Sequence, residues 1–119
     1  MTITLVTLLK RRPGMSVDDF RAYYESHHRR IGELVLSGLA TRYERRYLAP
    51  TDGTEQAFDF DVITEVDFPD QAACDAFHAA VSDPETLAMI VADEEKLFDR
   101  SRIRSFEVMA VASDLPVSA

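Results

Sequence analysis

The order of two hydrophobic periodicities along the chain constrains the fold more than any other feature of the sequence. Apolar and polar residues alternate, as in β-strands, over residues 39–50 and 57–68. Residues 3–10, which are rich in β-branched and apolar side chains, and residues 102–112 are also predicted to be strands. Apolar residues spaced by three and four, as in amphipathic helices, occupy the stretch between the first two strands and the stretch between the last two. The order β-α-β-β-α-β predicts an α+β domain of the ferredoxin-like type with an antiparallel sheet.

A helix is predicted directly after the Pro13-Gly14 turn. Ser16 is a suitable N-cap, and two aspartates in the first turn favour the positive end of the helix dipole. We expect this helix to end near Gly38. The following residues recur at intervals of three and four and are expected to face the core: Val17, Phe20, Tyr24, His27, Ile31 and Leu34.

Two helices are predicted between the third and fourth strands. Pro69 is expected to begin the first of them. Asp83 and Pro84 form a cap and a first-turn proline for the second, which reaches about Phe98. Both helices belong to one crossover, so the strand order is unchanged.

The length, charge and cysteine content limit the number of domains, the partners and the cellular location that we expect. The chain has 119 residues, of which 46% are apolar, which suits one domain over residues 1–112 with a flexible tail over 113–119. The formal net charge of −8 argues against a nucleic-acid partner. The single cysteine, Cys74, cannot form an intramolecular disulfide, and no apolar run approaches the length of a membrane span. We therefore expect a cytoplasmic protein without membrane contact.

The first strand is apolar on both of its faces. Ile3, Leu5 and Leu9 share one face, and Val6 and Leu8 share the other. Helices cover only one face of a ferredoxin-like sheet, so the second face needs another cover. A twofold homodimer through the sheet face, forming a dimeric α+β barrel, is the expected solution, and each subunit then keeps a pocket between its sheet and helices.

The opening "LLKRRPGMSVDDFRAYYESHH" resembles the start of EthD-domain proteins, in which a strand and a Lys/Arg-Pro-Gly turn precede a helix with aromatic residues and a histidine at set intervals. The segment "DEEKLFDRS" is similar to the Asp…Phe…Asp end of the same domain. This chain has Arg30 where family members often have proline, and Tyr24 where they often have tryptophan. The matching positions are Lys10, Pro13, Gly14, Phe20, Tyr23, Tyr24, His28, Asp93, Phe98 and Asp99.

The resemblance covers roughly residues 3–110 and implies the dimeric α+β barrel fold. Proteins of this fold include accessory proteins of ether degradation, polyketide cyclases and dehydratases, lactone isomerases and small monooxygenases, most of which use neither metal nor organic cofactor. The resemblance thus implies no cofactor here. It singles out His28 as the catalytic residue and Asp93 as a carboxylate that orients it.

The histidine pair admits two interpretations. Neutral imidazole is the usual general acid–base near pH 7, and His28 follows Tyr24 by one helical turn. His27 is expected on the apolar face, as a ligand-binding neighbour. Alternatively, both histidines are structural groups bonded to backbone or carboxylate. Adjacent helical residues point about 100° apart, so the pair is not expected to bind a metal ion.

The second strand offers further ligand-binding candidates. Tyr43, Arg45 and Tyr47 share one face, where hydroxyls and a guanidinium suit a carboxylate or enolate oxygen. The other interpretation of this strand is charge pairing with the acidic third strand, and we expect that role for Arg42 and Arg46, against Asp59, Asp61 or Glu65.

Two functions remain open at this stage. The first is a cofactor-independent acid–base enzyme of the isomerase, dehydratase or cyclase type, acting on a small apolar or aromatic metabolite. The second is a non-catalytic accessory or carrier protein of a degradation pathway; a small cofactor-free monooxygenase is a further alternative. Cys74 is expected to pack in the core, and the acidic run "ADEEKLFDR" to form a solvated helix face, apart from Asp93.

Overall fold

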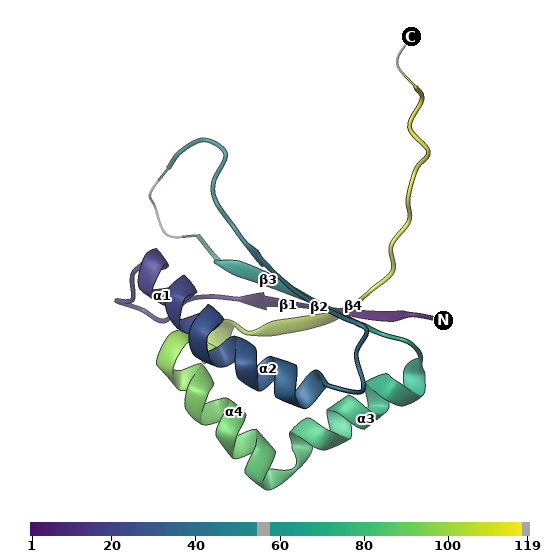
Figure 1. The fold of residues 1–119 in the computed structure, drawn as a ribbon. Helices are drawn as coiled ribbons and strands as arrows, with labels where there is room; N and C mark the ends of the chain where they lie inside the picture. The colour runs from purple at the N-terminus through teal and green to yellow at the C-terminus, as the bar shows by residue number, and fades with distance from the viewer. Residues whose placement is uncertain (55–57, 118–119) are drawn as a thin grey trace.

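The computed structural model describes residues 1–54 and 58–117, and it has the predicted α+β architecture (Figure 1). Four strands form one sheet in the order β2-β3-β1-β4, and every neighbouring pair is antiparallel. The prediction of a ferredoxin-like fold is therefore confirmed. The elements are β1 (Ile3–Leu9), α1 (Val17–Tyr23), η1 (Tyr24–His28), α2 (Arg29–Leu36), β2 (Arg42–Tyr47), β3 (Val62–Phe68), α3 (Gln71–Ser82), α4 (Pro84–Leu97), η2 (Arg100–Arg102) and β4 (Arg104–Val108).

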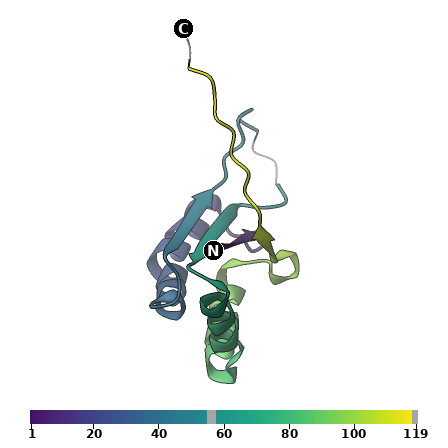
Figure 2. The same cartoon turned by 90° about the vertical axis from the view of Figure 1, so that its right-hand side faces the viewer.

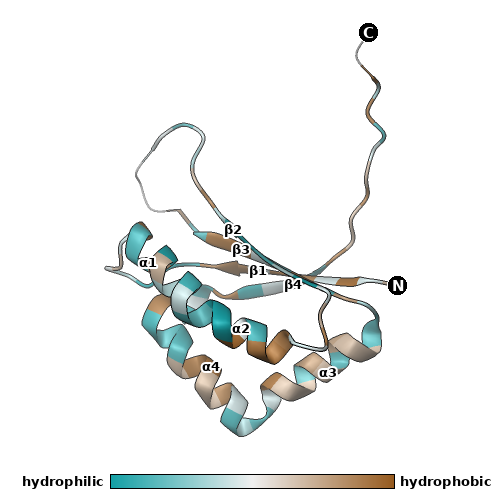
Figure 3. Cartoon of the chain, in the orientation of Figure 1, coloured by the Kyte–Doolittle hydropathy of each residue, from teal (hydrophilic) through white to brown (hydrophobic). Residues whose placement is uncertain are grey.

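All four α-helices lie on one face of the sheet, whereas the loop between β2 and β3 and the C-terminal tail extend toward the opposite side (Figures 1 and 2). Hydrophobic residues are concentrated in the central strands β1 and β3 and at the end of α2 (Figure 3). One core cluster is centred on Phe20 and Tyr24, and a second on Phe68 and Leu36. The sheet thus separates a covered face from an open one.

Three strands are clearly shorter than predicted, because each ends where its neighbours end. The strand expected over 39–50 spans Arg42–Tyr47, which pairs with β3 from Asp67 to Val62. The strand expected over 57–68 begins at Val62, which pairs with Leu9 at the end of β1. Ala57 lies outside the described residues. The strand expected over 102–112 ends at Val108, which pairs with Thr4 near the start of β1. Val62 is also the last β3 partner of β2, opposite Tyr47, so neither neighbour of β3 has a strand residue paired with it before Val62. Among the described strands β4 pairs with β1 alone, and it ends near the start of β1.

The helix N-caps were largely predictable. The hydroxyl of Ser16 accepts a hydrogen bond from the backbone of Asp19, and Asp83 caps α4 with Pro84 in its first turn. The prediction that Pro69 begins α3 is wrong. Asp70 is the cap, and its carboxylate accepts from a backbone amide one turn later.

A π-helical turn, η1, interrupts the first helix and was not predicted. It adds one residue to the turn, so the inward face is displaced by about 100° relative to an uninterrupted α-helix. Phe20 and Tyr24 are buried as expected, but Leu34 is 67% exposed. His27 is also exposed, so its predicted place on the apolar face is wrong, and His28 points inward instead.

The open face carries both the predicted ion pairs and an apolar patch. Arg42 pairs with Asp67 and Glu65, and Arg46 pairs with Glu65, so charge pairing with the third strand is confirmed for both arginines. Near β1 and β4 the same face is apolar. We call this surface the open-face patch; its members are Val6, Leu8, Ile63, Phe106 and Val108.

Candidate functional site

A cavity of about 340 Å³ lies between the helices and the covered face of the sheet, within the size range of small-molecule sites. Its wall is largely apolar, with residues such as Leu5, Val66 and Phe77. The exposed residues His78 and Ser105 belong to the wall and mark where the cavity meets solvent. The polar groups of the wall are Thr7, Tyr24, His28, Tyr43, Thr64, His78, Glu94 and Ser105.

His28 is held in one orientation at this cavity. Its Nδ1 lies 2.8 Å from a carboxylate oxygen of Asp93, and its side chain is only 12% exposed. The rings of Tyr24 and Phe98 meet the imidazole edge to face at 5.2 Å each. Because a carboxylate accepts the hydrogen bond, Nδ1 carries the proton and the neutral ring presents the Nε2 lone pair as a base.

Tyr23 completes the group that we call the histidine cluster, which consists of Tyr23, His28 and Asp93. The Tyr23 hydroxyl donates to the other oxygen of Asp93 at 2.5 Å. Burial, and then the bond to Asp93, raises the pKa of Tyr23 to about 12, so this phenol stays a donor at neutral pH. Asp93 therefore accepts from a group on each side, which fixes the imidazole without using its second nitrogen.

Glu94 is a cavity residue that the sequence analysis missed. Its side chain is 17% exposed, and burial raises its pKa above the usual value against the lowering effects of His28 and Arg100. Its place in the cavity wall differs from the solvated helix face predicted for this acidic run. The helical spacing could have indicated it, because Ile90 lies four residues before Glu94 and Leu97 three residues after it, on the apolar stripe of α4.

Tyr24 and Tyr43 both line the cavity. Their hydroxyls lie 3.1 Å apart, and burial raises the pKa of each phenol, so both stay protonated. Gly32 makes room for this pair, since a Cβ there would lie 2.9 Å from the Tyr43 ring and hydroxyl. The position of Tyr43 therefore depends on the absence of a side chain on α2.

Arg45 and Tyr47 do not line the cavity. Both contact Glu25 on η1: Arg45 donates to its two oxygens at 2.6 and 2.7 Å, and Tyr47 donates at 2.6 Å. The hydrogen bond from Arg45 is the main cause that lowers the pKa of Glu25. We call these three residues the arginine cluster. Its cation is neutralised internally, so Arg45 is not placed to stabilise charge on a cavity ligand.

His27 also lies outside the cavity wall. Its ring stacks on that of Tyr23 with centroids 4.5 Å apart, and its Nδ1 is 2.8 Å from the Ser26 hydroxyl. The adjacent histidines thus differ in environment, with one on the surface and one beside the cavity. This makes His27 a natural control for His28.

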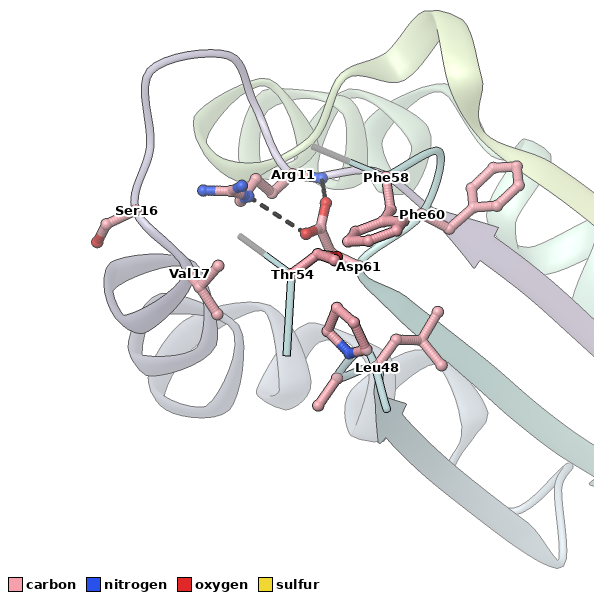
Figure 4. A pocket seen from close by; sticks show the side chains of 10 residues that line it. Arg11, Ser16, Val17, Leu48, Thr54, Phe58, Phe60 and Asp61 are labelled. Atoms are coloured by element: carbon pink, nitrogen blue, oxygen red, sulfur yellow. Dashed lines mark hydrogen bonds and ion pairs between the residues drawn. The ribbon is translucent and has the colours of Figure 1, made fainter. Parts of the chain in front are cut away.

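A second, open hollow of about 620 Å³ lies beneath the β2–β3 loop (Figure 4). Phe58 and Phe60 contribute apolar surface to it. The charged groups there are already paired, because Asp61 accepts from the backbone and side chain of Arg11 and also contacts Lys10. The helix-side cavity, with its oriented imidazole, is therefore the stronger candidate site.

The described part of the chain gives less support for a metal site, a cysteine nucleophile or a membrane-spanning helix. Within residues 1–54 and 58–117, no three His, Cys, Asp or Glu side chains are clustered so that they could hold a metal ion. Cys74 is buried in the core as expected, and burial raises its thiol pKa, which disfavours a nucleophilic thiolate. None of the described helices combines the length and apolar character needed to cross a bilayer.

Comparison with known proteins identifies the domain. The EthD domain family matches residues 12–101. An EthD-like protein from Ralstonia eutropha has a similar structure, with 19% identity and a TM-score of 0.63 over 96% of this chain and 97% of that one. A variant of SnoaB, a cofactor-independent oxygenase from Streptomyces nogalater, shares 16% identity at a TM-score of 0.56, with 94% and 95% coverage.

A dimeric protein of unknown function and ferredoxin-like fold from Bacteroides fragilis is also similar, with 11% identity and a TM-score of 0.60 over 90% of this chain and 94% of that one. At such identities these likenesses concern the fold alone. No curated protein matches the sequence significantly.

Proposed function

This chain belongs to the EthD-domain family, and from that premise and the geometry of the cavity we propose that it is a cofactor-independent acid–base enzyme for a small, largely apolar or aromatic metabolite. One observation carries the proposal: the His28 imidazole is oriented by Asp93 at 2.8 Å and borders a cavity of suitable size. An oriented imidazole with one free nitrogen is the arrangement of a general base.

The proposed step is proton transfer at carbon next to a carbonyl. The Nε2 lone pair of His28 takes the proton, and the C–H electron pair moves into the carbonyl group, leaving an enolate whose charge is on oxygen. Hydroxyl donors of the cavity wall stabilise that oxygen. Return of the proton to another carbon gives isomerisation. In dehydration the enolate reforms the carbonyl and a C=C bond as the C–O bond to a neighbouring hydroxyl breaks, and His28 returns its proton to that hydroxyl, which leaves as water.

Hydrogen–deuterium exchange tests this step without knowledge of the natural substrate. The probe is 2-tetralone in D₂O with EDTA, with exchange of its C1 hydrogens followed by NMR. The protein is expected to accelerate exchange, and His28→Ala is expected to lose about 10²–10⁴-fold of that acceleration, the usual contribution of a general base. His27→Ala, the matched control, should keep the wild-type rate.

The same assay separates the enzyme from the carrier. If His28→Ala exchanges the probe as fast as the wild-type protein, His28 is not the base. If the wild-type protein binds 2-tetralone in the cavity without accelerating exchange, the proposed chemistry fails and the accessory or carrier function is supported.

We also propose that two copies associate through the open-face patch. Phe106, on the edge strand β4 opposite Val6, is 50% exposed, and the Bacteroides neighbour is described as dimeric. The described parts of the β2–β3 loop and of the tail extend on this side (Figure 1). Phe106→Glu should convert a dimer into a monomer in sedimentation velocity. Leu34→Glu, on the exposed side of α2, should not. A monomeric wild-type protein at micromolar concentration would contradict the proposal.

A further inference from the structure

Three hydroxyl side chains form a straight row across the covered face of the sheet. Thr7 on β1 lies directly opposite Thr64 on β3 and Ser105 on β4. All three residues line the cavity that also contains His28. The register of the sheet therefore places a polar row on the cavity wall.

On β1 and β3 the neighbouring positions of this face are apolar. Leu9 pairs with Val62 on one side of the row, and Leu5 pairs with Val66 on the other. Residues two apart in a strand share a face, so Thr7 and Thr64 lie between apolar pairs, whereas Ser105 on β4 has the exposed Glu107 beside it, opposite Leu5. The polar strip is therefore bounded by apolar side chains on the two central strands and by a carboxylate at the β4 edge.

The three hydroxyls keep hydrogen-bond donors and acceptors that the protein itself does not use. Thr7 and Ser105 lie 2.9 Å apart and share one hydrogen bond, which leaves one of their two O–H donors for another acceptor. Thr64 is only 6% exposed, and its hydroxyl makes no hydrogen bond to another side chain in the described part of the protein. Its oxygen is not among the fully enclosed polar atoms without a partner, so it stays accessible from the cavity that it lines, where a ligand or water atom can bond to it.

The charge of the cavity limits what that ligand is. None of the described residues in its wall is lysine or arginine, and Arg45, which lies opposite Thr64 on β2, is paired with Glu25. A phosphate or carboxylate group would therefore meet no free cationic side chain among the described wall residues. The buried carboxyl group of Glu94 further disfavours an anion. Neutral oxygen groups fit better, because hydroxyls both donate and accept hydrogen bonds.

We propose that Thr7, Thr64 and Ser105 bind the oxygen atoms of a neutral oxygenated ring compound and thereby select such compounds over plain hydrocarbons. This inference rests on the proposed function, because it assigns the substrate class of the same cavity. The row holds the ligand's carbonyl or hydroxyl groups, and His28 acts on a hydrogen nearby. These are binding residues, distinct from the base.

The test compares 2-tetralone with tetralin, the same ring system without the oxygen, by NMR titration. The wild-type protein is expected to bind the ketone at least tenfold more tightly. Thr64→Val and Thr7→Val should each reduce this preference about threefold to tenfold, the usual net value of one hydrogen bond. Thr64→Ser keeps the hydroxyl and should restore the preference, and Thr4→Val, on the opposite face of β1, should leave it unchanged.

The possible outcomes separate the two proposals. Equal binding of both compounds, with no effect of the threonine variants, would overturn the hydroxyl row but leave the cavity and His28 intact. If neither compound perturbs the NMR signals of cavity residues, both proposals fail. Loss of preference in Thr64→Ser as well as Thr64→Val would assign the effect to packing and would also overturn the row.

Discussion

The histidine cluster and the arginine cluster each include one residue of the π-helical turn η1, His28 in the first and Glu25 in the second, yet they differ in chemical character. Each combines a tyrosine, a carboxylate and a basic side chain. In the arginine cluster, Glu25 accepts three hydrogen bonds from Arg45 and Tyr47, so the cation and anion neutralise one another. In the histidine cluster, Asp93 binds only one nitrogen of His28, and the second remains for the cavity.

This difference shows that polar residue types alone do not identify a reactive site. Arginine stays protonated and presents several donors, so its pairing with a carboxylate is a structural lock. Imidazole exchanges one proton near neutral pH, so the same kind of pairing orients it for the proton transfer that we propose. The comparison can be tested by changing matched residues in the two clusters.

The largest difference is expected between the two carboxylates in the exchange assay. Asp93→Asn replaces a carboxylate that accepts from both Tyr23 and His28 with an amide that has one acceptor oxygen and one NH₂ donor. The Nδ1 proton of His28 then loses its charged acceptor, which should reduce 2-tetralone exchange by about 10²–10⁴-fold. Glu25→Gln should leave the rate within twofold of wild type. Equal losses in both variants, or no loss in Asp93→Asn, would contradict the assignment of the two clusters.

The arginine cluster, which is not expected to affect the exchange rate, should contribute to the stability of the fold. Glu25→Ala leaves Arg45 and Tyr47 without their shared acceptor and is expected to lower the free energy of unfolding by about 1–3 kcal/mol, measured by urea denaturation. The control is Glu33→Ala, since its pair with Arg29 is a surface contact at 4.0 Å and should contribute about 0–1 kcal/mol. Similar losses in both variants would show that the arginine cluster is not a lock.

Gly32 sets the position of Tyr43, which belongs to neither cluster. The Tyr43 hydroxyl is 3.1 Å from that of Tyr24, and the Arg45 guanidinium lies over the Tyr43 ring. Gly32→Ala should move the Tyr43 ring and destabilise the protein by a net ~1–2 kcal/mol, even though alanine favours the helix. In a Tyr43→Ala background the same substitution should cost nothing. An equal cost in both backgrounds would exclude the contact with Tyr43 as its cause.

The smallest effects concern pH, and they have opposite signs for two glutamates. The pKa of Glu25 is lowered in the fold, so its stabilisation is present above the unfolded-state pKa and is lost as the pH falls through the folded value. The pKa of Glu94 is raised, so its contribution is present below the unfolded-state pKa and is lost as the pH rises through the folded value.

Unfolding of the two glutamine variants between pH 3 and pH 8 measures this contrast. Relative to wild type, Glu25→Gln should be least stable at neutral pH, and Glu94→Gln should be most stable there. The differences are expected to be on the order of tenths of a kcal/mol, because solvent screens Glu25. Shifts of the same sign in both variants would contradict the proposed burial of Glu94.

Several features were predictable because they depend on neighbours in sequence. The caps Ser16 and Asp83 satisfy backbone amides within their own first turn, and strand alternation identified which residues share a face. The inward orientation of His28 was suggested by resemblance to EthD proteins, whereas simple α-helical periodicity placed His27 inward. The π-helical turn decided between them, and its extra residue leaves no clear mark in a local hydropathy pattern.

The sequence by itself determined the strand and helix order, the caps and the apolar central strands, since propensity, capping and periodicity act over a few residues. Only the tertiary structure decided that Arg45 is locked by Glu25, that Glu94 lies at the cavity, and that three hydroxyls align across the strands. Sheet register, helix rotation and burial set those relations. They arise from packing between segments distant in the chain, which no local pattern encodes.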